Sequence, residues 1–286
     1  MAGSKVKVVT VVGAGIMGRG IALASARAGF ETRVIEPSAR VIESARSELD
    51  KILARSREKG EIQPADADAA TARLTWSEAL DDAKGSDLVI EAVPESVALK
   101  AELYTKLAPI LPREAIVATN TSGLSITELA ATSDRATRFV GMHFFNPVHR
   151  MRLVELVRGL ETGDEALEVA EAVARAMGKE TVVVRESPGF VTSRINALIG
   201  NEAFAMLEAG VASARDIDKA LKLGLNHPMG PFEMVDLVGL DTRLSILEYL
   251  HRTLGEKYRP SPLLTQYVKA GRLGRKVGRG VYDYPP

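Results

Sequence analysis

The six residues GAGIMG, at positions 13–18, constrain the fold of this chain more than any other segment. They form the pattern G-x-G-x-x-G, which by itself is weak evidence. Here the pattern follows a run of mostly β-branched residues, 5–12, that predicts a buried strand. It also opens a segment of small residues that predicts a helix ending at Gly29. A glycine-rich turn between a strand and a helix is typical of the first part of a dinucleotide-binding α/β unit.

Each glycine of this loop has its own physical purpose in such a unit. Gly13 permits the tight turn, Gly15 lets a pyrophosphate approach the backbone, and Gly18 lets the helix and strand pack closely. The N-terminus of the helix adds free N–H groups and a positive dipole for the phosphates. The candidate cofactor site also includes the residues between the glycines, Ala14, Ile16 and Met17. The alternative is a glycine turn that binds nothing.

An acidic residue ends the next predicted strand, residues 31–36. The carboxylate of Glu36 can accept hydrogen bonds from both ribose hydroxyls of an adenosine and would repel a 2′-phosphate. The sequence therefore favours NAD over NADP, although Arg33 and Arg40 lie nearby and leave NADP open. The alternative is that Glu36 is an ordinary surface residue.

Short apolar runs alternate with helical patterns as far as residue 186. We predict strands at 87–93, 115–122, 139–145, 153–159 and 181–186, and helices at 37–60 and 163–178. This alternation implies right-handed crossovers and a Rossmann-like, doubly wound, mainly parallel sheet with helices on both faces. Only helical patterns follow, including 188–210, 214–224 and 240–255. The sequence thus predicts a Rossmann-like domain at 1–186 and an all-helical domain at 187–286.

The composition limits the class of function. Lys+Arg and Asp+Glu both total 37, so the net charge is zero and nothing indicates a nucleic-acid partner. The chain has no cysteine, which excludes disulfides, thiolate metal sites and a cysteine nucleophile, and no metal site is predicted. The apolar run near the N-terminus is interrupted by glycines and lacks a signal-peptide pattern. We therefore expect no membrane association and a cytoplasmic location.

Three polar residues are candidates for chemistry. Ser122 ends a predicted strand, at the edge where open α/β sheets bind ligands, but it could equally be a turn or N-cap serine. His143 lies near the end of the predicted strand 139–145, among aromatic residues. Glu155 shares one face of its strand with apolar residues, so it is a candidate buried carboxylate that needs a partner.

A nearby histidine would suit that carboxylate. Glu155 on one ring nitrogen would hold the tautomer of His143 and stabilise the imidazolium, and the other nitrogen could take a proton from a hydroxyl. The alternative is a satisfied core histidine, with Glu155 paired to Arg152 or Arg158. A second histidine, His149, follows a proline in a turn-like polar segment, and we expect it at the surface.

A family resemblance extends over nearly the whole chain. Its segments, in order, are GAGIMGRGIA, DLVIEAVPES, NTSGLSITELA, GMHFFNPVHRMRLVELV, ESPGFVTSRI, DIDKALKLGLNHPMGPFEMVDLVGLDT and GRLGRKVGRGVYDY. They resemble the 3-hydroxyacyl-CoA dehydrogenases, most closely the short bacterial 3-hydroxybutyryl-CoA dehydrogenases. The resemblance implies reversible hydride transfer between C3 of an (S)-3-hydroxyacyl-CoA and the nicotinamide of NAD. It also implies a C-terminal helical domain that closes the substrate cleft and forms a homodimer.

The resemblance also implies roles for individual residues. It makes His143 the general acid/base, Glu155 its partner, and Ser122 a contact to substrate and cofactor. Further cofactor contacts fall on Glu95, Lys100, Asn146 and Lys276. The phosphates of the CoA arm would meet a basic helix, which here carries Lys51, Arg55, Arg57 and Lys59. The alternative for this helix is an ordinary solvated face.

One position departs from the family pattern. Many members have asparagine in a PGFxxNR motif, where its amide contacts the substrate region, but this chain has Ser193 there. Ser193 is a candidate catalytic residue acting through water, and Asn196 is an alternative. Two other functions stay open: a dehydrogenase of a free 3-hydroxy acid or sugar acid, and a non-enzymatic crystallin-like or NAD-sensing relative. The intact HFFNP segment disfavours the first, and retention of Ser122, His143 and Glu155 disfavours the second. Chain-length preference and pathway, whether fatty-acid oxidation, butanoate synthesis or polyester metabolism, are not predicted.

Overall fold

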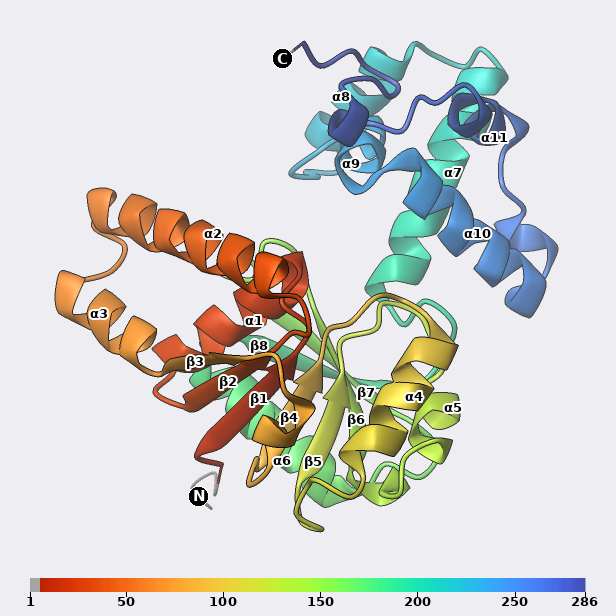
Figure 1. The fold of residues 1–286 in the computed structure, drawn as a ribbon. Coiled ribbons are helices and arrows are strands. Elements are labelled where there is room, and N and C mark those ends of the chain that lie inside the picture. Colours follow the sequence, from red (N-terminus) through yellow and green to blue (C-terminus); the bar gives the residue numbers. More distant parts are fainter. Residues whose placement is uncertain (1–5, 286) are drawn as a thin grey trace. The chain divides into compact units, whose positions relative to one another are not determined.

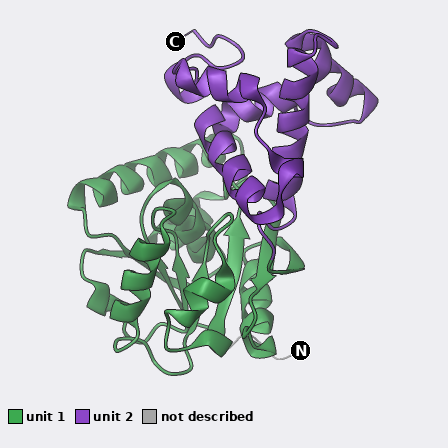
Figure 2. Ribbon diagram, turned by 90° about the vertical axis from the view of Figure 1, so that its right-hand side faces the viewer, with its two compact units in different colours: residues 1–186 green, residues 187–286 purple. Residues whose placement is uncertain are grey.

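The computed structural model describes residues 6–285. Contacts between residues divide the chain into two compact units, Met1–Glu186 and Ser187–Pro286, which are coloured separately in Figure 2. The first unit contains the sheet, and the second is built from helices (Figure 1).

The first unit is organised around one eight-stranded sheet with the strand order β3-β2-β1-β4-β5-β6-β7-β8. Neighbouring strands are parallel except β6 and β7, which are antiparallel. The prediction of a mainly parallel, Rossmann-like sheet is therefore confirmed. The strands are β1 (Val8–Val12), β2 (Glu31–Ile35), β3 (Leu74–Ser77), β4 (Leu88–Glu91), β5 (Ile116–Thr119), β6 (Phe139–Phe144), β7 (Leu153–Arg158) and β8 (Glu180–Arg185).

Helices cover both faces of this sheet. They are α1 (Ile16–Arg27), α2 (Ala39–Glu58), α3 (Pro64–Ala72), α4 (Val97–Leu107), α5 (Ile126–Ala131) and α6 (Asp164–Ala176). Helices α1 and α6 share an apolar cluster with Val140, Met142 and Phe144 of β6. The alternate residues of β6 point the other way, because successive side chains of a strand face opposite sides. On that side Phe139 contacts Tyr104 of α4, with the ring centroids 5.0 Å apart.

Strand β3 is the one element of the sheet that the sequence does not predict. It has four residues, LTWS, and pairs with β2 at the edge of the sheet. Its two apolar residues alternate with polar ones and form no apolar run, whereas the equally short β4 and β5 begin with apolar runs that predict buried strands. The predicted first strand began at residue 5, which lies outside the described residues, and β1 itself begins at Val8.

The second unit contains helices α7 (Thr192–Glu208), α8 (Ala214–Gly224), α9 (Pro231–Val238), α10 (Leu240–Leu254) and α11 (Pro262–Lys269). Its core includes Phe204 and Phe232, whose rings meet edge to face at 5.1 Å. The C-terminal segment is attached by the buried Asp236, which accepts hydrogen bonds from the backbone N–H groups of Val281 and Tyr282. Within residues 6–285, no helix is long and apolar enough to span a membrane.

Candidate active site

The glycine loop joins β1 to α1 and has space for a ligand at one of its three glycines. Gly13 has a φ of +99°, and a Cβ there would lie 2.7 Å from the carbonyl oxygen of Ala92. A Cβ on Gly18 would lie 1.8 Å from the carbonyl oxygen of Gly13, so only glycine fits. At Gly15, in contrast, no atom lies within 4 Å of the Cβ position. Gly15 and Ile16 are exposed at the N-terminus of α1, which is the arrangement that a bound pyrophosphate requires.

Glu36 lies directly beside this loop, one residue after β2. Its Oε2 accepts a hydrogen bond from the backbone N–H of Ala14 at 3.1 Å, and its Oε1 accepts one from Ser38 at 3.2 Å. Arg33 is directed elsewhere: its guanidinium pairs with Glu31 and donates to the carbonyl oxygen of Lys84 at 2.6 Å. The carboxylate thus lies beside the open glycine loop, and one of the two cations that left NADP open is already engaged.

His143 and Glu155 meet across the only antiparallel strand pair of the described sheet. They are direct partners in the register of β6 and β7, and His143 Nδ1 lies 2.7 Å from Glu155 Oε2. His143 is 7% exposed and Glu155 is fully buried. The two arginines considered as alternative partners are paired elsewhere, Arg152 with Glu180 and Arg158 with Asp164. A buried carboxylate on Nδ1 favours a ring that donates there, which leaves proton exchange to Nε2.

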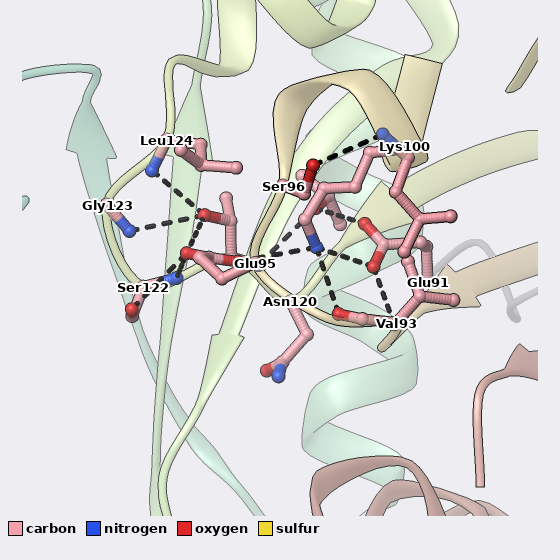
Figure 3. Close-up of polar contacts among 12 residues, drawn as sticks. Glu91, Val93, Glu95, Ser96, Lys100, Asn120, Ser122, Gly123 and Leu124 are labelled. Atoms are coloured by element: carbon pink, nitrogen blue, oxygen red, sulfur yellow. Dashed lines mark hydrogen bonds and ion pairs between the residues drawn. The ribbon is translucent and has the colours of Figure 1, made fainter. Parts of the chain in front are cut away.

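The loop that carries Ser122 begins where β5 ends. Asn120 Oδ1 accepts a hydrogen bond from the backbone N–H of Phe144 at 2.9 Å, so this loop is held beside the end of β6 next to His143. Ser122 itself is exposed. Its backbone N–H donates to Glu95 Oε1 at 3.0 Å, as Figure 3 shows. The structure therefore brings the predicted residues Ser122, Glu95 and His143 to the same edge of the sheet.

Lys100 is almost completely buried in helix α4. Only 1% of its side chain is exposed, and its Nζ lies 2.6 Å from Glu91 Oε1 and 3.4 Å from Glu95 Oε2 (Figure 3). Glu91 is also fully buried, at the end of β4. Glu91 is not among the residues predicted from the sequence, although a carboxylate that ends the apolar strand DLVIE is a visible signal of a buried pair.

The remaining predicted residues are distributed over both units. Helix α2 and the residue after it carry three exposed basic residues at intervals of four, Lys51, Arg55 and Lys59. Lys51 forms an ion pair with Glu48 at 2.7 Å. Asn146 is exposed just after β6. In the second unit, Ser193 lies in the first turn of α7, and Lys276 Nζ lies 2.6 Å from each carboxylate oxygen of Asp241.

Comparison with protein families adds a decisive observation. The family model for the 3-hydroxyacyl-CoA dehydrogenase NAD-binding domain matches residues 8–187, and the model for the C-terminal domain of the same enzymes matches residues 189–284. The chain belongs to the 3-hydroxyacyl-CoA dehydrogenase family. The predicted family is therefore confirmed, and the matched NAD-binding domain confirms NAD as the cofactor.

Individual members of this family are similar over their full length. The chain is 47% identical to the probable 3-hydroxybutyryl-CoA dehydrogenase of Bacillus subtilis, an alignment that covers 98% of each chain. It is 45% identical to the 3-hydroxybutyryl-CoA dehydrogenase of Bradyrhizobium diazoefficiens, with 98% of this chain and 96% of the relative covered. The crystal structure of (S)-3-hydroxybutyryl-CoA dehydrogenase from Ralstonia eutropha matches with a TM-score of 0.96 at 44% identity, covering 99% of this chain and all of that one. Both units of the chain thus have counterparts in these dehydrogenases.

Proposed function

We propose that this family member interconverts (S)-3-hydroxybutyryl-CoA and acetoacetyl-CoA with NAD(H). One observation carries this proposal: the buried pair of His143 and Glu155 lies near the same edge of the sheet as the open glycine loop. An acid/base pair beside a nicotinamide site is what oxidation of a secondary alcohol needs. The short acyl chain is supported by the names of the relatives that align over the full length.

Each residue of the pair has a separate task in the proposed reaction. NAD, when bound, supplies the acceptor for the hydride that leaves C3 of the substrate. Nε2 of His143 removes the proton from the 3-hydroxyl, and the charge of Glu155 stabilises the imidazolium that forms. Ser122, with its exposed hydroxyl, donates a hydrogen bond to the substrate oxygen. In the reverse direction His143 returns the proton.

Binding is assigned to the surfaces around this pair. The backbone at Gly15 and the N-terminus of α1 would hold the pyrophosphate, and Glu36 the adenosine ribose. The basic residues of α2 would meet the phosphates of CoA. Asn146 and Lys276 are further proposed contacts to the cofactor, and Ser193 to the substrate region. We also propose that two copies of the chain form a homodimer through residues 187–286 and that the enzyme works in the cytoplasm.

The proposal is tested by mixing the protein with NADH and acetoacetyl-CoA and following NADH absorbance. We expect rapid NADH consumption, slower consumption of NADPH, and none with free acetoacetate. Turnover of free acetoacetate in place of the thioester would instead support a free hydroxy-acid dehydrogenase. NADH binding without turnover of either substrate would support a non-enzymatic role.

A further inference from the structure

A buried carboxylate that has no assigned role lies beneath the proposed active site. Glu91 is fully buried at the end of β4, and its two oxygens accept four hydrogen bonds. The donors are the backbone N–H of Val93 at 2.8 Å, Lys100 Nζ at 2.6 Å, Tyr104 Oη at 2.7 Å and Thr119 Oγ1 at 2.7 Å. Burial, and then the charge of Glu91, raise the pKa of Tyr104 well above its ordinary value, so this phenol stays a donor. A buried charge with so many donors is held in one position.

These bonds connect Glu91 to loops on both sides of β4. On one side, the Val93 bond shapes the start of the β4–α4 loop, whose Ala92 carbonyl lies against Gly13 of the cofactor loop. On the other side, Thr119 Oγ1 donates to Glu91 and accepts from the backbone N–H of Thr121, at the start of the Ser122 loop. One carboxylate therefore contacts the supports of both the cofactor loop and the serine loop.

Lys100 extends this connection to the proposed active-site serine. Its Nζ lies between Glu91 at 2.6 Å and Glu95 at 3.4 Å, and also donates to the carbonyl oxygen of Val93 at 3.4 Å. Glu95 in turn accepts from the hydroxyl of Thr121 at 2.5 Å and from the backbone N–H of Ser122 at 3.0 Å. With only 1% of its side chain exposed, Lys100 has its ammonium inside the protein, while Glu95 is 43% exposed at the surface of the site.

We propose that Glu91 is a positioning residue, which acts through Lys100 and Thr119 to hold Glu95 and the Ser122 loop in the geometry that hydride transfer requires. Glu91 is fully buried and acts only through these partners, whereas the family resemblance makes Glu95 and Lys100 contacts to the cofactor. The inference rests on the proposed function and deepens it, because it names a residue behind those that touch substrate or cofactor.

The energetics of buried pairs separate this role from a purely structural one. Removing one member of a buried ion pair leaves an uncompensated charge and destabilises the fold strongly, whereas replacing both members with neutral groups is often tolerated. The double variant Glu91→Gln/Lys100→Met should therefore recover the melting temperature that either single variant loses. It should not recover activity, because Glu95 and Ser122 would still lack their support.

The experiment compares the two single variants, the double variant and each of them combined with Ser122→Ala. We expect the singles and the double to lower kcat by about 10- to 100-fold, the range that small displacements near reacting atoms produce. In the Ser122→Ala background the same changes should lower kcat little further, because the effects of residues that act through one another are not additive. For Glu91→Gln the dissociation constant of NADH, measured by fluorescence, should rise by a smaller factor than kcat falls, because Gly15 and Glu36 still bind the other end of the cofactor.

A matched control is available on the same helix. Lys106 and Glu102 form an equally short pair, 2.6 Å, but are 62% and 63% exposed, so Glu102→Gln/Lys106→Met should change neither kcat nor melting temperature. Full activity in the double Glu91/Lys100 variant would overturn the proposal, and so would a fall in kcat/KM for Glu91→Gln that weaker NADH binding explains entirely. An inactive unmodified protein would overturn the proposed function instead, so the two failures are distinguishable.

Discussion

His143 Nδ1 lies 2.7 Å from Glu155 Oε2, and the two residues are direct cross-strand partners in the antiparallel pair of β6 and β7. Their contact is therefore set by strand register. Gly141, two residues before His143, is adjacent to Val157 of β7, where a Cβ would lie 2.7 Å from the valine Cβ. Close packing of the two strands at this point helps to hold the acid/base pair in place.

The first prediction concerns the charge of Glu155. We expect Glu155→Gln to lower kcat by about 10²-fold or more, because the amide cannot stabilise the imidazolium that forms on proton transfer. His143→Gln should abolish turnover while NADH binding, measured by fluorescence, persists. His251 provides a matched control, since this partly exposed histidine also contacts a glutamate, Glu256, at 3.1 Å. Activity lost equally in His251→Gln would contradict a specific role for His143.

The second prediction contrasts two glycines of the cofactor loop. Gly18→Ala should destabilise or unfold the protein, because its Cβ would lie 1.8 Å from the Gly13 carbonyl oxygen. Gly15→Ala should fold normally, because nothing lies within 4 Å of its Cβ, but the methyl group would occupy space that the pyrophosphate needs. Melting temperature and NADH affinity measure the two effects. Unchanged NADH affinity in Gly15→Ala would place the phosphates elsewhere.

The third prediction concerns Arg243 of α10, which is 1% exposed. Its Nε has no hydrogen-bond partner among residues 6–285, and burial lowers the pKa of Arg243 to about 10. A base with a depressed pKa in the folded state destabilises the fold at every pH below that value, where both states are charged. The penalty begins to fall as the pH rises through the folded-state pKa, and it vanishes once the pH exceeds the pKa of the unfolded chain.

Arg243→Met should therefore raise the free energy of unfolding by about 1–3 kcal/mol at pH 7. The difference between variant and unmodified protein should shrink when the pH is raised above 10. Denaturant titrations at several pH values measure this difference in the free energy of unfolding. The control is Arg252→Met, on the exposed side of the same helix. Destabilisation by Arg243→Met would contradict the penalty assigned to the buried guanidinium.

The fourth prediction concerns Ser193, which occupies a position where many family members have asparagine. It lies partly buried in the first turn of α7. We expect Ser193→Asn to keep activity and Ser193→Ala to lower kcat/KM modestly, because one hydroxyl is lost. Steady-state kinetics with acetoacetyl-CoA measure both. A loss above about a hundredfold for Ser193→Asn would show that the serine cannot be replaced by the amide.

The sequence by itself determined the glycine loop, the acidic residue after the second strand and the alternation of strands and helices. These features are local: the turn after β1 depends on Gly13 and Gly18, and an apolar run such as VVTVV needs only its own period to predict a strand. Strand β3 shows the limit of this reasoning, because LTWS contains no apolar run, unlike the equally short LVIE of β4, and only its pairing with β2 identifies it as a strand.

Only the tertiary structure decided which charged side chains meet. The sequence left Glu155 with three candidate partners, and the register of β6 and β7 placed it on His143, since a shift of one residue would turn it to the other face of the sheet. The same holds for Glu91 and Lys100, which lie on different elements and pair because the loop after β4 brings Lys100 of α4 back to the end of that strand. Such pairings depend on contacts between elements, which local patterns of residues do not contain.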